Sequence, residues 1–136
     1  MSNVEQTLSI IKPDAVERNL DNEIKDMFKN KGFKIIKEKK IQIEKLEAEK
    51  FYKVHETKPF YGDLCTYLSS GPIVVMVLEK ENSVLANREL MGATNPKDAE
   101  DGTIRKKYGI SIDKNSVHGS DSIENAKIEI DFFFKD

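Results

Sequence analysis

Residues 73–78, IVVMVL, limit the possible fold of this chain more than any other segment. Every residue in the run is apolar, most are β-branched, and the turn-forming pair Gly71-Pro72 comes directly before it. A short run of this kind is typical of a central strand whose two faces are both covered. The run therefore predicts a layered α/β domain and argues against an all-helical bundle.

Strand and helix patterns alternate along the rest of the chain. Residues 7–11 form a short apolar run that stops at Lys12-Pro13, and residues 33–43 alternate apolar side chains with lysines, so both are expected to be strands. A short last strand is expected at residues 117–119. Helical spacing or capping signals predict helices at about 20–31, 44–55, 61–68, 82–92 and 121–134.

Several side chains are expected to have definite places in these helices. Leu46, Phe51 and Val54 should face the core, as should Ile123 and its helical neighbours on the last helix. Asn82 should cap the fourth helix. Asp121, with Glu124 three residues on, should cap the last helix through a capping box.

This order of elements fits two α/β architectures. One is a parallel, doubly wound sheet, and the other is a split βαβ, ferredoxin-like antiparallel sheet. Periodicity alone does not separate them, although the alternating second strand favours the antiparallel arrangement.

Length and charge restrict the class of protein. The 136 residues suit a single domain over residues 1–136, and 22 basic against 24 acidic residues give a net charge of −2. This balance does not support nucleic-acid binding or attraction to an anionic membrane. We expect no signal peptide and no membrane span. A single cysteine, Cys65, excludes an internal disulfide and suits the cytoplasm.

Metal and glycine-loop chemistry are poorly supported by the sequence. One cysteine and two distant histidines give no zinc-ligand spacing. The P-loop and GxGxxG patterns are absent, so a bound nucleotide would be held by side chains. Lys12, Arg88 and Arg105 could bind phosphate oxygens, although each alone could equally be a solvated surface charge.

His118, in VHGSD, is the strongest single candidate for chemistry. An imidazole with a pKa near 6.5 is mostly neutral and nucleophilic at neutral pH. Gly119 and Ser120 would leave space beside the ring and offer a backbone N–H and a hydroxyl. A partly buried histidine at a strand end, or an acid–base residue, remains the alternative. Tyr52 and Phe60 are ambiguous, because aromatic residues at helical spacing usually belong to the core, although Phe60 follows a proline-containing break where its ring could be exposed for stacking.

Four motifs together resemble one family over nearly the whole chain. LSIIKPDAV, RELMGATNP, GTIRKKYG and NSVHGSD, in this order, closely resemble nucleoside diphosphate kinase, and the ending IEIDFFFKD is similar to bacterial members. The resemblance implies a ferredoxin-like sandwich, with a four-stranded antiparallel sheet covered by helices. It also implies transfer of the γ-phosphoryl group from a nucleoside triphosphate, mainly ATP, to nucleoside diphosphates such as GDP, which maintains NTP and dNTP pools.

The resemblance also implies a role for individual residues. His118 would be the phosphohistidine nucleophile of a ping-pong mechanism, oriented by Ser120 and Glu129, with Tyr52 beside the reacting phosphate. Mg²⁺ would be the cofactor and would be held mainly by the nucleotide phosphates, with no direct metal ligand from the protein. The nucleotide would contact phosphate-binding, ribose-binding and base-stacking residues: Lys12, Phe60, Arg88, Thr94, Arg105, Ile112 and Asn115.

The resemblance implies a homo-oligomer, a hexamer or a tetramer, with a long contact loop at about 93–115. Asn22 stands where the family usually has glycine, and a left-handed or capping conformation there would have only a small local effect. Two other functions would use similar features. A histidine phosphotransfer module would be a helical bundle, which the apolar strand disfavours, and a binding-only relative would be expected to lack His118, Lys12 or Arg105.

Overall fold

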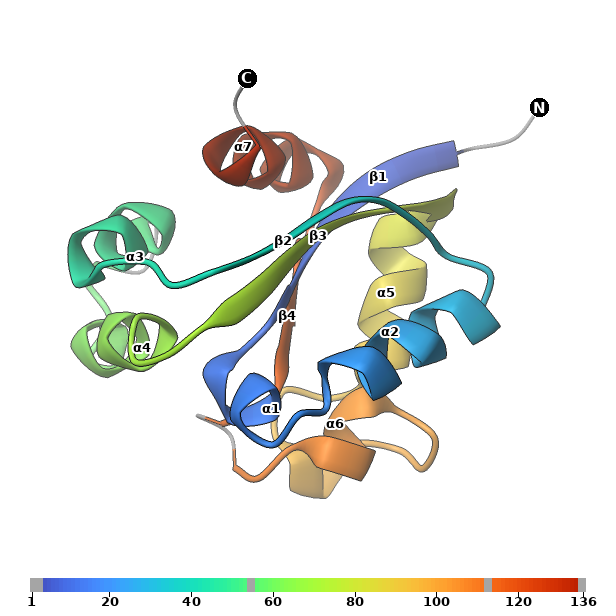
Figure 1. Ribbon diagram of the computed structural model, residues 1–136, viewed down its shortest axis with the longest axis horizontal. Coiled ribbons are helices and arrows are strands. Elements are labelled where there is room, and N and C mark those ends of the chain that lie inside the picture. The colour runs from blue at the N-terminus through green and yellow to red at the C-terminus, as the bar shows by residue number, and fades with distance from the viewer. Residues whose placement is uncertain (1–3, 54–55, 112–113, 135–136) are drawn as a thin grey trace.

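The computed structural model describes residues 4–53, 56–111 and 114–134, and Figure 1 shows its sheet running diagonally between two groups of helices. The strands are β1 (Val4–Ile11), β2 (Lys34–Ile41), β3 (Ile73–Glu81) and β4 (Val117–Gly119), in the order β2-β3-β1-β4. Every neighbouring pair is antiparallel. This confirms the predicted ferredoxin-like α/β fold and excludes the parallel alternative.

The apolar run in β3 is explained by two hydrophobic layers. Val74, Met76 and Leu78 face a core shared with α1 (Pro13–Glu17), α2 (Asp21–Asn30), α5 (Ser83–Met91) and α6 (Ile104–Tyr108). Ile73 and Val75 face a second core shared with α3 (Lys45–Phe51), α4 (Tyr61–Leu68) and α7 (Ile123–Phe133). Because helices cover both faces of the sheet, β3 has no polar side until it passes Leu78.

Two short helices were not expected from the sequence. α1 and α6 have five residues each, which is too short to show a helical period. α6 and a single 3-10 turn, η2 (Pro96–Asp98), also give local structure to the long loop at about 93–115. None of the described helices has the length and apolar character needed to cross a membrane.

One predicted cap is correct in position only, and the other is wrong. Asn82 is the N-cap of α5, as expected, but it has a left-handed conformation and its side chain makes no capping hydrogen bond. The carboxylate of Glu5 instead accepts from Val84 N at 3.0 Å. At α7 the N-cap is Ser122, whose hydroxyl accepts from Asn125 N, so the capping box predicted at Asp121 does not form.

Three other local expectations also differ from the structure. Leu46 is 59% exposed and Ile123 is 47% exposed, because each lies on the solvent side of its helix. Val54 lies outside the described residues. Asn22 lies in the first turn of α2 with its side chain exposed, and it is neither the cap nor in a left-handed conformation.

Leu78→Ala is expected to lower the free energy of unfolding by about 3 kcal/mol, because it leaves a cavity between β3 and the helices. Urea denaturation measures this loss. Leu46→Ala is the matched control, since its side chain is already mostly in water, and it should change stability by less than about 0.5 kcal/mol. Equal losses in the two variants would contradict the assignment of Leu78 to the core.

Candidate active site

His118 lies in the short edge strand β4, paired with Ile10 of β1. Its Nε2 is 2.9 Å from Oε1 of Glu129 on α7, and the Ser120 hydroxyl donates to the same oxygen at 3.0 Å. Ser120 in turn accepts from Leu8 N at 3.2 Å, which ties the group to the sheet. In the tautomer that donates from Nε2 to the carboxylate, the lone pair of His118 lies on Nδ1. Within the described part of the chain, Nδ1 makes no hydrogen bond.

Two aromatic rings hold the imidazole edge-on. The ring centroids of Phe51 and Tyr52 lie 5.3 Å and 6.4 Å from that of His118. Burial, and then the nearby Glu129 carboxylate, raise the pKa of Tyr52, so its phenol stays protonated at neutral pH. The side chain of His118 nevertheless remains 21% exposed. The sequence did not indicate Phe51 as part of this site, because its spacing also fits a core residue.

Gly119 was expected to leave space beside the His118 ring, but the structure gives a different reason for a glycine at this position. A Cβ there would lie 2.3 Å from Nδ2 of Asn87 and 2.7 Å from the terminal methyl of Met91, both on α5. Glycine thus allows close approach of α5 to the strand that carries His118, and the space is filled by protein. The hydroxyl of Ser120 is also fully buried.

A chain of polar contacts joins three of the predicted nucleotide-binding residues. Lys12, just after β1, donates from Nζ to Oδ1 of Asn115 at 3.0 Å, and Asn115 donates from Nδ2 to the carbonyl of Thr94 at 3.1 Å. Lys12 and Asn115 are buried, whereas Thr94 is exposed. Residues distant in sequence therefore meet at the end of β1 that adjoins β4.

Arg105 is a buried cation attached to backbone carbonyls. Its guanidinium donates to Gly92 O at 3.0 Å and to Val117 O at 2.9 Å, next to His118. Burial, followed by the charge of Arg88, lowers the pKa of Arg105 to about 10. Its Nε is buried without a hydrogen-bond partner among the described residues. The guanidinium is thus a cation at neutral pH that has lost water and would gain from an anion.

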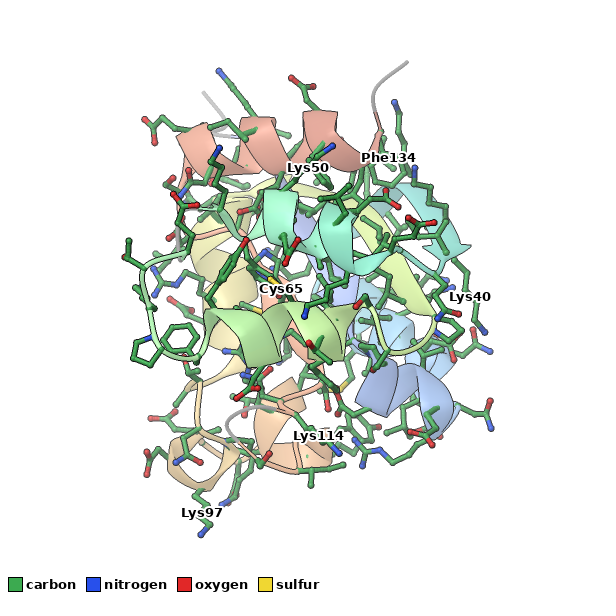
Figure 2. All side chains as sticks on the ribbon, turned by 90° about the vertical axis from the view of Figure 1, so that its left-hand side faces the viewer. Lys40, Lys50, Cys65, Lys97, Lys114 and Phe134 are labelled. Carbon is green, nitrogen blue, oxygen red and sulfur yellow. The ribbon has the colours of Figure 1, made fainter. Side chains whose placement is uncertain are left out.

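Two clefts contain the remaining predicted residues that the structure describes. Arg88, Thr94 and Arg105 line a cleft of about 660 Å³, together with the carboxylates of Glu89, Asp98 and Glu100. Phe60 lines a smaller one of about 190 Å³ with residues of α4 and Lys114: Asp63, Leu64, Tyr67 and Lys114. Figure 2 looks onto α3 and α4 and shows Lys114 below α4, beside α6.

The structure thus gathers most of the predicted residues into two neighbouring contact groups. His118, Ser120, Glu129 and Tyr52 form the first, and Lys12, Asn115 and Thr94 form the second. Arg105 contacts the strand between them through Val117. Ile112 lies outside the described residues. Among the described residues, no cluster of three histidine, cysteine or carboxylate side chains could hold a metal ion.

Proteins of one known family are similar to this chain over nearly its whole length. A family model described as "Nucleoside diphosphate kinase" matches residues 5–136. A nucleoside diphosphate kinase of Geotalea uraniireducens is 58% identical over 131 residues, which cover 96% of each chain. One of Campylobacter jejuni is 59% identical over 132 residues, covering 97% of this chain and 96% of the relative.

Solved structures give the same result for the fold. A crystal structure of the Aquifex aeolicus nucleoside diphosphate kinase superposes with a TM-score of 0.95 at 40% identity, covering 97% of this chain and 96% of the other. Sequence and structure agree over nearly the same residues. The chain therefore belongs to the nucleoside diphosphate kinase family of phosphotransferases.

Proposed function

We propose that this chain, as one domain over residues 1–136, transfers the γ-phosphoryl group of a nucleoside triphosphate, mainly ATP, to nucleoside diphosphates through a phosphohistidine at His118. In the first half-reaction the Nδ1 lone pair attacks the γ-phosphorus, and the bond to the β–γ bridging oxygen breaks. In the second, a terminal oxygen of the acceptor diphosphate attacks the same phosphorus and the N–P bond breaks. This exchange would maintain the NTP and dNTP pools.

The contact between His118 and Glu129 is the observation that carries the proposal. A carboxylate that accepts from Nε2 keeps the proton on that nitrogen and stabilises the positive charge that the ring gains as Nδ1 forms a bond. Ser120 holds the carboxylate in place. The rings of Phe51 and Tyr52 restrict rotation of the imidazole, so the nucleophile is oriented before substrate binds.

The surrounding cations and hydrogen-bond donors suit a polyphosphate. Lys12, Arg88 and Arg105 would hold phosphate oxygens, Thr94 would donate a hydroxyl, and the Tyr52 phenol would donate near the reacting group. Three carboxylates line the same cleft as Arg88 and Arg105. A divalent cation bound to the phosphates would offset their repulsion, which supports Mg²⁺ entering with the nucleotide. The ion would supply charge neutralisation on the transferring group.

The rest of the nucleotide would use contacts that are independent of the base. Phe60 and Ile112 would enclose the base, which suits indifference to purine or pyrimidine because every base has a stacking face. Lys12 and Asn115 would bind the ribose hydroxyls.

We propose further that the protein is a cytoplasmic homo-oligomer, a hexamer or a tetramer. The loop at about 93–115 would lie at the contacts between subunits. Ile110 in this loop is 58% exposed, so an apolar side chain is available to be covered there. Size-exclusion chromatography with light scattering measures the assembly directly.

Intact-mass spectrometry tests the proposed mechanism. Brief exposure to Mg-ATP without acceptor should add one phosphate to the protein, and subsequent GDP should remove it and yield GTP. A protein that binds ATP and makes GTP from GDP without ever gaining this mass would contradict the phosphohistidine route. A protein that makes no GTP at all would contradict the transfer itself.

A further inference from the structure

Asp14, in α1, is a buried carboxylate at a junction of three segments. Its Oδ1 accepts from the Tyr67 hydroxyl on α4, and its Oδ2 accepts from the Ser116 hydroxyl at 2.9 Å and from Arg18 Nη2 at 3.2 Å. The backbone N–H of Asp14 also donates to the Tyr67 oxygen at 2.9 Å. A buried carboxylate with three donors is well satisfied, and losing a donor would be costly.

Ser116 is the most informative of these partners. It is fully buried and adopts a φ of 74°, a left-handed conformation that is costly for a residue with a Cβ. Its carbonyl accepts from Lys12 N at 2.8 Å. The bond from its hydroxyl to Asp14 therefore helps hold a strained residue that has Asn115 on one side and the strand bearing His118 on the other.

Tyr67 connects the same carboxylate to the smaller cleft. Its ring lines that cleft beside Phe60 and Lys114, while its hydroxyl donates to Asp14. Burial, and then the hydrogen bond to Asp14, raise the pKa of Tyr67, so the phenol remains a donor at neutral pH. Arg18 adds a third connection, because its Nη2 also donates to the carbonyl of Tyr108 in α6.

We propose that Asp14 is a positioning residue for the phosphoryl transfer, acting through the hydroxyl of Ser116 to set the place of Asn115 and His118 relative to Lys12. The proposal deepens the proposed function and depends on it. Asp14 is buried and lines neither of the two clefts assigned to the nucleotide. It fixes the backbone between the ribose-binding and phosphate-accepting residues, and through Tyr67 it connects that backbone to the wall of the cleft assigned to the base.

A double-mutant cycle between Asp14 and Ser116 tests this link. Asparagine has nearly the same shape as aspartate, but its amide N–H would face one of the groups that donate to Asp14. The rate of phosphohistidine formation at saturating Mg-ATP should therefore fall about tenfold in Asp14→Asn. Ser116→Gly removes the hydroxyl and relieves the left-handed strain, and should by itself cost about fivefold. In the Ser116→Gly background, Asp14→Asn should cost no more than about threefold, because residues acting through one contact are not additive.

If the rate losses of the two single variants multiply in the double variant, the proposal is overturned. Two substitutions that act separately, through stability alone, give losses of that kind. Full activity in Ser116→Gly would overturn it as well, even if Asp14→Asn did not fold. Asp26→Asn, an exposed carboxylate on α2, is the charge-matched control and should leave the rate unchanged.

The wild-type protein in the same assay separates the two claims. If it forms no phosphohistidine, the proposed mechanism fails, and the cycle is then measured by the affinity for Mg-ADP in titration calorimetry. Non-additive affinities would support the link from Asp14 to Ser116, and additive ones would overturn it.

Discussion

His118→Ala is expected to lower kcat/KM for transfer from ATP to GDP by at least about 10⁴-fold, equivalent to about 5.5 kcal/mol of transition-state stabilisation. The loss should be this large because no other described side chain is placed to accept the phosphoryl group. The remaining contacts could at best hold donor and acceptor, whose anionic phosphates repel. Quench-flow kinetics of the wild type and variant, with Mg-ATP and GDP, measure the difference.

His55→Ala is the matched control, because it removes the only other histidine of the chain. It should retain activity within about twofold of the wild type. The affinity of His118→Ala for Mg-ADP should stay within a few-fold, because Lys12, Arg88 and Arg105 are intact. A variant that binds nucleotide normally and still transfers phosphate within tenfold of the wild-type rate would show that His118 is not the nucleophile.

The layered fold could be predicted from short segments whose residue patterns fit few kinds of secondary structure. The uniformly apolar residues 73–78 could hardly be anything but a strand covered on both faces, and the structure has helices on both. Strand direction was harder, because periodicity describes burial and contains no information about which strand pairs with which. Asn82 is the N-cap of α5 but makes no side-chain capping bond, and the cap predicted at Asp121 is at Ser122, because capping depends on φ and on the exact turn. A shift of one position in the start of the helix decides whether Asp121 or Ser122 is the N-cap.

The residues of the candidate site were predicted largely from the family resemblance, and their contacts with one another were not predicted. Lys12, Asn115 and Arg105 were separate candidates in the sequence. In the structure Lys12 donates to Asn115, and Asn115 donates to the carbonyl of Thr94. Arg105 donates to the carbonyl of Val117. Asp14 belongs to the KPDAV motif, yet nothing in the motif indicates that its carboxylate meets Ser116, 102 residues later. A positive φ at a serine has no sequence signal, since serine is not a typical left-handed residue.

The sequence pointed to Gly119 as a neighbour that matters for His118, but the reason that it suggested was wrong. The glycine was expected to leave space beside His118, whereas in the structure it allows Asn87 and Met91 to lie close to the strand. The imidazole ring itself is contacted edge-on by Phe51 and Tyr52, which lie far earlier in the sequence. Long-range packing of this kind depends on the order of the strands in the sheet, and a local sequence pattern does not predict that order.

Arg105→Lys is expected to lower kcat/KM by about 10²- to 10³-fold, or about 3 to 4 kcal/mol. Arginine donates to the carbonyls of Gly92 and Val117 from two different nitrogens, and its buried Nε has no hydrogen-bond partner among the described residues. A lysine has one nitrogen, so it would leave a buried carbonyl unpaired or withdraw from the phosphate. Steady-state kinetics of phosphate transfer from Mg-ATP to GDP measure the loss. Lys97→Ala, which removes an exposed cation from the same loop, should stay within about twofold.

The lowered pKa of Arg105 gives this prediction a pH dependence. Because the pKa is about 10 in the folded protein, the cation is present throughout the neutral range and is lost as pH rises through 10. Nucleotide affinity should therefore decline above pH 10, and circular dichroism at each pH shows whether the protein remains folded. An affinity for Mg-ADP that stays constant to pH 11 in folded protein would contradict the role of this charge.

Stability should change in the opposite direction over the same range. Above pH 10 the unfolded chain keeps a proton on Arg105 that the folded protein has lost, so this residue's contribution to stability rises with pH there. Below pH 10 the folded protein bears the full cost of a buried cation. A bound polyphosphate would reduce that cost by pairing the charge, so Mg-ADP should raise the melting temperature of the wild type more than that of Arg105→Lys. Equal increases would show that the cost of burying this cation is unrelated to nucleotide binding.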